Sequence, residues 1–396
     1  MAKRSVNQLD LEGQRVFIRV DFNVPIEAGE VSDNTRLRAA LPTIRLVLEK
    51  GARVVVLGSH LGRPKGKPVP EMSLKPVATC LADLLDHPVI FAKDCIGNPA
   101  KEIVENAPEN CVVLLENLRF HRGEEQNDPD FAKQLATLAD VYINDAFGVA
   151  HRAHASVEAL VHLLPVVGTG LLIERELGYL SQLLNNPARP FVAILGGAKV
   201  SDKIEIIQNL LPLVDRLLIG GAMAYTFLKE MGYPVGRSLV ENNKLVATRN
   251  IIASAKKHDV ALMLPVDHVV AEKMEAGSPT ETLEIDDPRI GERLGLDIGP
   301  RTENIYRDTL RDVQTVFWNG PMGVFELEAF AQGTLAVAKA VANMSGTSIV
   351  GGGDSIAAVN KAAIAPHITH ISTGGGAALE FLSGRTLPGI AVLSEV

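Results

Sequence analysis

The sequence has few cysteines. Its 396 residues include three, Cys80, Cys95 and Cys111. They form no C-x-x-C pair, and none has a histidine at the spacing of a zinc motif. This pattern excludes a disulfide framework, so we expect buried free thiols in a reducing cytoplasm.

Long apolar runs and an excess of basic residues are also absent. No apolar stretch approaches the roughly 20 residues of a membrane-spanning helix, and the charged N-terminal segment lacks the apolar core of a signal peptide. We therefore expect neither membrane insertion nor export. The formal net charge of -8 argues against nucleic acid as the main partner.

The composition and the apolar pattern indicate an α/β protein. Hydrophobic residues make up 46% of the chain and charged residues 22%, as in ordinary globular proteins. Short β-branched runs alternate with stretches of helical period, which predicts parallel sheets with helices on both faces. We expect strands at 16–20, 53–57, 88–91, 112–115, 141–143, 191–195, 216–219, 261–264, 315–318, 347–350 and 369–372, and helices at 37–49, 203–211, 222–231, 244–257 and 330–344.

The predicted strands are too many for a single sheet, and the sequence contains a candidate boundary between two domains. Gly168 and Gly170 precede a stretch of helical period at 171–184, which ends in Asn-Asn-Pro. We therefore predict two doubly wound, Rossmann-like parallel-sheet domains joined by a hinge helix. The expected limits are 1–168 for the first domain, 169–185 for the connecting helix and 186–386 for the second domain.

Basic residues follow the strands of the first half. In open α/β sheets, ligands bind beyond the carboxyl ends of the strands. These positions and the start of the first helix hold six arginines and one histidine that we favour as a ligand: Arg36, Arg38, Arg63, Arg119, Arg122, Arg152 and His60. Each arginine alone is typical of a solvated surface. Together at one edge they predict a site for a small, multiply charged anion that carries phosphate and carboxylate groups.

Glycine follows the strands of the second half. The turns are LGGAKVSDK (195–203), IGGAMAY (219–225), WNGPMGVFE (318–326), GGGDS (351–355) and STGGGA (372–377). Glycine at such turns lets backbone amides at a helix N-terminus approach a ligand closely, which predicts a cradle for a polyphosphate. The Walker and dinucleotide-binding glycine motifs are both absent.

Charged residues beside these glycines indicate what the cradle holds. Asp354 follows three glycines, where a carboxylate either binds Mg²⁺ against phosphate oxygens or serves as a helix N-terminal acid. Lys199 and Lys203 lie about one helical turn apart.

An anion site and a nucleotide cradle favour phosphoryl transfer, which requires the two sites to close together and exclude water. Two other classes remain. An NAD-dependent dehydrogenase is disfavoured by the missing dinucleotide motif. A non-catalytic two-domain anion-binding protein is disfavoured by the absent signal peptide and by Lys199, Lys203 and Asp354.

Eight motifs, taken in order, resemble those of the phosphoglycerate kinase family. They are RVDFNVP (19–25), SHLGRP (59–64), ENLRF (116–120), AHRAHAS (150–156), LGGAKVSDKI (195–204), WNGPMGVFE (318–326), GGGDS (351–355) and STGGGA (372–377). The resemblance extends from about residue 15 to residue 388. It implies an enzyme that reversibly transfers a phosphoryl group from 1,3-bisphosphoglycerate to Mg-ADP, giving 3-phosphoglycerate and ATP.

The resemblance also implies roles for individual residues. The residues expected to bind the triose are Asp21, Asn23, Arg36, His60, Arg63, Arg119 and Arg152. Arg36, Lys199 and Lys203 are expected to balance charge on the transferring group, and the amides of Gly352, Gly353, Gly375 and Gly376 to bind its oxygens. The nucleotide is expected to contact Gly197, Gly221, Leu294, Leu296, Asn319, Pro321, Val324, Glu326 and Ser355, with Asp354 on Mg²⁺.

Three further expectations come from the resemblance. Ser355 stands where the family usually has threonine, which keeps the hydroxyl group. The tail, residues 387–396, is expected to pack on the first domain. The family is usually monomeric, so we expect a monomer whose partners are small-molecule substrates.

Overall fold

The computed structural model describes residues 3–393, which form two compact units. The first unit contains residues 3–178 and 386–393, and the second contains residues 179–385. Helix α6 (Leu171–Asn185) begins in the first unit and ends in the second. Among the described residues, no helix has the length and apolarity that a membrane crossing requires.

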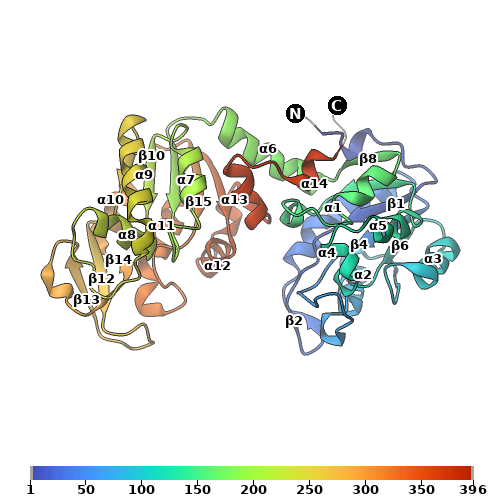
Figure 1. The fold of residues 1–396 in the computed structure, drawn as a ribbon, viewed down its shortest axis with the longest axis horizontal. Coiled ribbons are helices and arrows are strands. Elements are labelled where there is room, and N and C mark those ends of the chain that lie inside the picture. Colours follow the sequence, from blue (N-terminus) through green and yellow to red (C-terminus); the bar gives the residue numbers. More distant parts are fainter. Residues whose placement is uncertain (1–2, 394–396) are drawn as a thin grey trace. The chain divides into compact units, whose positions relative to one another are not determined.

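The first unit is built on a six-stranded parallel sheet with the order β5-β6-β4-β1-β7-β8. Strands β1, β4, β6 and β8 of this sheet are labelled in Figure 1. Its strands are β1 (Arg15–Arg19), β4 (Val54–Gly58), β5 (Val89–Phe91), β6 (Cys111–Leu114), β7 (Val141–Asn144) and β8 (Val166–Thr169). Strand β4 is buried along its whole length, as its continuous run of apolar residues predicts. A short antiparallel pair, β2 (Ile26–Glu27) and β3 (Glu30–Val31), lies apart from this sheet.

The strand order explains how helices cover this sheet. The chain leaves β1 toward β4 on one side and later returns to β7 on the other, and right-handed crossovers in opposite directions place helices on opposite faces. The helices are α1 (Thr35–Glu49), α2 (Lys75–Leu85), α3 (Gly97–Asn106), α4 (Arg122–Glu125) and α5 (Pro129–Ala136). Alternate strand residues such as Val55 and Leu57 pack with Leu37 of α1 and Leu81 of α2 in one apolar cluster.

The second unit repeats this architecture. Its parallel sheet has the order β11-β10-β9-β15-β16-β17. The strands are β9 (Phe191–Leu195), β10 (Arg216–Ile219), β11 (Ala261–Met263), β15 (Thr315–Asn319), β16 (Thr347–Gly351) and β17 (His370–Ser372). The helices are α7 (Ile204–Leu210), α8 (Met223–Glu230), α9 (Leu245–Lys257), α10 (Pro300–Thr309), α11 (Gln332–Ala342), α12 (Gly353–Lys361) and α13 (Gly376–Leu382). The predicted α/β fold class with parallel sheets is confirmed.

All the strands expected from the sequence are present, but the sequence reading missed others. It missed β8, a short strand directly before α6, because its glycines suggested a connection. It also missed an antiparallel sheet of β12 (Asp267–Ala271), β13 (Thr280–Glu284) and β14 (Leu294–Ile298). Strand β13 is mostly exposed and rich in glutamate and threonine, so it lacks an apolar run that would mark it as a strand.

The last described residues pack on the first unit. Helix α14 (Pro388–Ala391) is drawn in red in Figure 1. Two hydrogen bonds join it to β7 and to the segment that follows β7. Gly389 N donates a hydrogen bond to Ala150 O at 2.9 Å, and Asn144 Nδ2 donates one to Gly389 O at 3.0 Å. A side chain at Gly389 would lie 2.5 Å from Val157, so the close packing requires glycine. Residues 394–396 of the predicted tail lie outside the described part of the chain.

Candidate functional site

The carboxyl ends of β1, β4, β6 and β7 lie together at one edge of the first sheet. Strand β1 pairs in parallel with β4 and β7, and β4 pairs in parallel with β6. The segments that follow these four strands contain most of the predicted anion-binding residues. The sheet order therefore brings together residues separated by more than a hundred positions in sequence.

At this edge, the carboxylate of Asp21 lies between the side chains of Arg36 and His60. Arg36 Nη1 donates a hydrogen bond to Asp21 Oδ2 at 2.8 Å, while the Arg36 side chain remains 38% exposed. The other Asp21 oxygen lies 4.0 Å from His60 Nδ1. Asp21 thus holds the guanidinium of Arg36 in place and leaves part of it open to a ligand.

Asn23 links the segments that follow β1 and β4. Its Oδ1 accepts a hydrogen bond from Gly62 N at 2.9 Å. Arg119 is nearly buried and donates from Nη1 to Gly62 O at 2.8 Å. Arg63 and Arg152 are exposed at the ends of their segments. The fold thus orders Asn23 and Arg119 and leaves Arg63 and Arg152 in solvent.

His60 is held as a neutral imidazole. Burial, followed by the charges of Arg19, Arg119 and Arg36, holds its pKa well below the usual value. Arg19 Nη2 lies 3.4 Å from His60 Nδ1, and since arginine only donates, Nδ1 is the acceptor. The imidazole proton therefore sits on Nε2, which is available to donate to an anion.

Sequence reasoning missed the support beneath this edge. Arg19, the last residue of β1, is fully buried, and its Nε donates to Ser156 Oγ at 2.7 Å. Ser156 Oγ donates in turn to Glu124 Oε1 at 2.6 Å. Arg19 is the first residue of the RVDFNVP motif. It lies inside the predicted strand 16–20, whereas the predicted ligands lie in the segments that follow the strands. The separation of 137 positions between Arg19 and Ser156 hides their contact.

Glycines in the second unit permit close backbone contacts. Gly197 N donates to Pro321 O at 3.0 Å, and Gly221 N donates to Met322 O at 2.9 Å. A side chain at Gly221, whose φ is +66°, would lie 2.6 Å from Gly197 N. The turns after β9, β10 and β15 thus pack backbone against backbone, which only glycine permits here.

Lys203 and Asn319 form a partly buried polar pair near the turn that follows β16. Lys203 Nζ donates to Asn319 Oδ1, and Asn319 Nδ2 donates to Gly351 O at 2.6 Å. Burial lowers the pKa of Lys203 to about 8, against the opposing charges of Asp202 and Asp354. Lys199 is exposed. A partly buried ammonium without a full counter-charge favours an anionic ligand.

The triple-glycine turns lead into helices as predicted. Gly352 has φ +93°, and α12 begins at Gly353 with Asp354 exposed in its first turn. Ser355 is buried and its Oγ accepts from Gly320 N at 2.6 Å. Gly375 has φ +49°, and α13 begins at Gly376.

The remaining predicted nucleotide residues lie between the antiparallel sheet and the turn that follows β15. Val324 N donates to Leu296 O at 2.9 Å. Leu294, Leu296 and Val324 belong to one small apolar cluster with the buried Phe330. Glu326 is exposed close to it in sequence. This arrangement provides an apolar surface suited to a planar ring.

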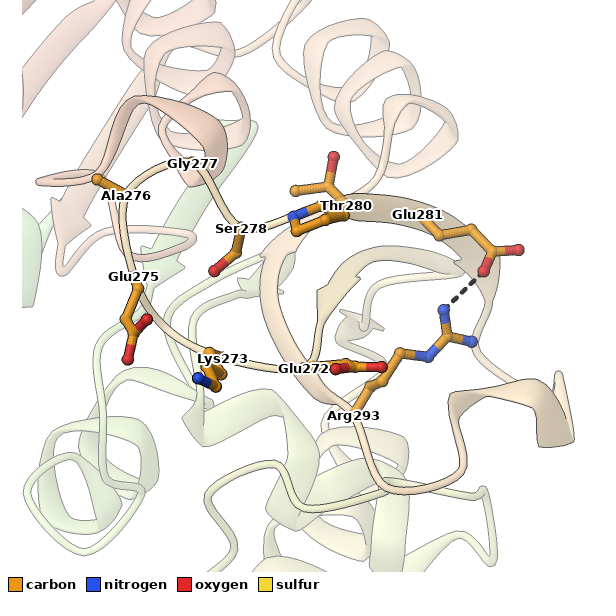
Figure 2. A pocket seen from close by; sticks show the side chains of 10 residues that line it. Glu272, Lys273, Glu275, Ala276, Gly277, Ser278, Thr280, Glu281 and Arg293 are labelled. Carbon is orange, nitrogen blue, oxygen red and sulfur yellow. Dashed lines mark hydrogen bonds and ion pairs between the residues drawn. The ribbon is translucent and has the colours of Figure 1, made fainter.

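A separate pocket of about 570 Å³ lies on the segment that connects β12 and β13 (Figure 2). Its lining includes Glu272, Lys273, Glu275 and Arg293 and none of the predicted site residues. Arg293 is paired with Glu281 at 2.6 Å. Because mixed charges line this pocket and its arginine is already paired, we place the functional site at the two sheet edges instead.

Comparisons with known proteins identify the family. A model of the family described as phosphoglycerate kinase matches residues 6–385. Similar curated proteins include the phosphoglycerate kinases of Solibacter usitatus, 56% identical over 401 residues, and Koribacter versatilis, 53% identical over 403 residues. Each match covers 100% of both chains.

Solved structures agree with this result. The phosphoglycerate kinase of Coxiella burnetii is 41% identical, with a TM-score of 0.89 and coverage of 98% of each chain. That of Pyrococcus horikoshii is 33% identical, with a TM-score of 0.81 over 99% of this chain and 98% of the other. The chain belongs to the phosphoglycerate kinase family.

Proposed function

We propose that the two sheet edges divide the substrates of the reaction between them. The chain is a phosphotransferase that moves a phosphoryl group between 1,3-bisphosphoglycerate and ADP, giving 3-phosphoglycerate and ATP. We assign the triose to the arginine-rich edge of the first unit and the nucleotide to the glycine-rich edge of the second. The observation that carries this assignment is the Asp21–Arg36 pair at 2.8 Å, which presents a partly exposed guanidinium.

Positioning and charge supply most of the catalysis in this proposal. The acyl phosphate is already an activated donor, so the protein needs no general base. Asp21, Asn23, His60, Arg63, Arg119 and Arg152 hold the triose, and His60 donates from Nε2 as a neutral group. Arg36, Lys199 and Lys203 balance the charge of the transferring group. The amides of Gly352, Gly353, Gly375 and Gly376 bind its oxygens.

The nucleotide and its metal ion fit the second edge. Gly197, Gly221, Leu294, Leu296, Pro321 and Val324 border the base, Glu326 contacts the ribose, and Asn319 and Ser355 order the phosphate turn. Asp354 is exposed beside amides suited to phosphate, and Mg²⁺ is typically held by one or two carboxylates together with substrate phosphates. When bound, Mg²⁺ neutralises phosphate charge. We also propose a cytoplasmic monomer that has no nucleic-acid partner.

The test is turnover of 3-phosphoglycerate with Mg-ATP, with hydroxylamine present to trap the acyl phosphate. We expect hydroxamate from the wild type. In Arg36→Ala we expect kcat to fall by about 10³ to 10⁵, as for other catalytic arginines. Asp354→Ala should also form little product.

Arg38→Ala is the matched control. The sequence places Arg38 with the basic residues of this edge, but its side chain is exposed on the same helix, donates to Asn34 Oδ1 at 2.9 Å and is not among the triose residues proposed above. Its activity should stay within a few-fold of the wild type. An Arg36→Ala enzyme with near-normal kcat would refute the role of Arg36.

A further inference from the structure

Three side chains with different metal-binding atoms lie together beyond the carboxyl ends of β5 and β6. Asp94 and Cys95 follow β5, and His121 follows the 3-10 helix Leu118–Phe120 after β6. One ligand atom from each side chain lies within 4.8 Å of the other two. None of the three belongs to the triose or nucleotide residues proposed above.

The carboxylate and the imidazole are held in place by their surroundings. His121 Nε2 lies 2.7 Å from Asp94 Oδ1, which also accepts from Cys95 N at 2.7 Å. The ring of His121 packs on the nearly buried ring of Phe131, with centroids 5.5 Å apart. The side chains of His121 and Asp94 are 31% and 41% exposed. An ion therefore reaches both from solvent without disrupting the core.

Cys95 offers a third candidate ligand atom, from the buried side of the cluster. It is fully buried and forms no disulfide, and within residues 3–393 its thiol hydrogen-bonds only its own backbone amide. Cys111 differs, because its thiol donates to Val112 O at 3.5 Å. Cys95 is thus a buried free thiol whose sulfur lies within 4.8 Å of a carboxylate oxygen and an imidazole nitrogen.

We propose that Asp94, Cys95 and His121 form a Zn²⁺ site with a water molecule as the fourth ligand. A mixed sulfur, nitrogen and oxygen set suits zinc, whereas Mg²⁺ prefers oxygen alone, so the magnesium of the reaction does not compete. Tetrahedral zinc requires ligand atoms about 3.3 to 3.6 Å apart. His121 Nε2 and Asp94 Oδ1 are 2.7 Å apart and all three ligand atoms lie within 4.8 Å of one another, so the required spacing falls within the range that the cluster already spans.

The protons and charges of this site balance. Burial, followed by the nearby charges of Asp94 and Glu124, raises the pKa of the free Cys95 thiol well above its usual value, so its proton leaves to solvent only as the metal binds. The imidazole exchanges its Nε2 contact with Asp94 Oδ1 for the metal and keeps its proton on Nδ1. One thiolate and one carboxylate neutralise the two charges of the ion. Binding joins the segment after β5 to the segment that carries Arg119, so zinc should stabilise the first unit.

Cobalt is the probe, because Co²⁺ takes zinc sites and gives a thiolate-to-metal charge-transfer band in the near ultraviolet. The experiment titrates the nucleotide-free full chain with CoCl₂ and then displaces the cobalt with ZnCl₂. We expect one equivalent of Co²⁺ to produce the band and Zn²⁺ to abolish it. Cys95→Ser should lose the band, and His121→Gln should weaken metal affinity at least about tenfold.

Cys80→Ser is the matched control, because Cys80 lies on α2 in the same unit and outside the cluster. It should keep the band. The proposal fails if the wild type gives no band, or if the band persists in Cys95→Ser. If circular dichroism shows that Cys95→Ser misfolds, the metal affinity of His121→Gln is the deciding measurement. An unchanged metal affinity in that variant would also overturn the site.

Discussion

The guanidinium of Arg19 lies 3.7 Å from Glu124 Oε1, and both side chains are fully buried. Each has further partners, because Ser156 accepts from Arg19 and donates to Glu124. A charge pair in such a place tolerates the loss of both charges better than the loss of one, since a single loss leaves the other buried without compensation.

Arg19→Met should therefore destabilise the protein by about 3 to 5 kcal/mol, and the double variant Arg19→Met, Glu124→Gln should recover most of that loss. Thermal unfolding of the wild type, the double variant and both single variants, Arg19→Met and Glu124→Gln, measures this coupling. NMR titration of His60 should also show its pKa rising in Arg19→Met, because a nearby positive charge is gone. Additive effects of the two substitutions would contradict the pairing.

The activity should depend on the protonation of Lys203. Burial lowers the pKa of this side chain to about 8, so its positive charge is lost as the pH rises through that value. We expect kcat/KM for the nucleotide to fall above about pH 8. In Lys203→Arg the fall should disappear, because a guanidinium stays charged throughout this range.

Lys199→Arg provides the comparison for this profile. Lys199 is exposed, so its replacement should leave the shape of the pH profile as in the wild type. A wild-type profile that is flat from pH 7 to pH 9.5 would show that Lys203 does not titrate as described.

Asp145 should make stability depend on pH. Its Oδ1 accepts from Leu172 N at 2.9 Å at the start of α6, but burial outweighs these bonds and raises its pKa to about 7. The pKa of the folded state therefore exceeds that of the unfolded state. The resulting stabilisation is complete below about pH 4 and is lost as the pH rises through about 7.

Asp145→Asn should remove this pH-dependent part of the free energy of unfolding, which is on the order of a few kcal/mol. The asparagine keeps a side-chain oxygen that can accept the hydrogen bond from Leu172 N. The measurement compares the melting temperatures of both proteins at pH 5 and pH 7.5. Asp83→Asn, an exposed carboxylate on α2, should behave as the wild type. An equal pH dependence in wild type and Asp145→Asn would refute the argument.

Two glycine substitutions separate backbone strain from backbone contact. Gly221 has φ +66°, and an added Cβ would lie 2.6 Å from both Gly197 N and Gly197 O. Gly232 has φ +86°, but nothing lies within 4 Å of its added Cβ. Gly232→Ala should lower the free energy of unfolding by about 1 kcal/mol, because of backbone strain alone. Gly221→Ala should lower it by roughly 1 to 3 kcal/mol more, because of overpacking.

Nucleotide affinity provides the second readout for this pair. Gly221→Ala should weaken ADP binding, measured by calorimetry, because the turns after β9 and β10 must separate. Gly232→Ala should bind ADP normally. Equal stability and affinity in the two variants would argue against the close backbone packing at Gly221.

The sequence alone determined much about this protein. Parallel strands of one sheet end at a common edge, so residues that directly follow apolar runs can be assigned to the edge of their own sheet without coordinates, such as Asp21 and His60 in the first half and Asp354 in the second. The continuous apolar runs of the central strands and the glycine turns set the fold class. Motif order then identified the family, since each motif keeps its place on the chain.

Tertiary structure alone decided the contacts that support these edges. Arg19 meets Ser156 across 137 positions, and Cys95 meets His121 because β5 and β6 are neighbours in the sheet. Strand β13 is not predicted from the sequence, because most of its residues face solvent and form no apolar pattern. Local patterns record which residues are buried, whereas partners across a sheet are set by strand order, which no short segment of sequence contains.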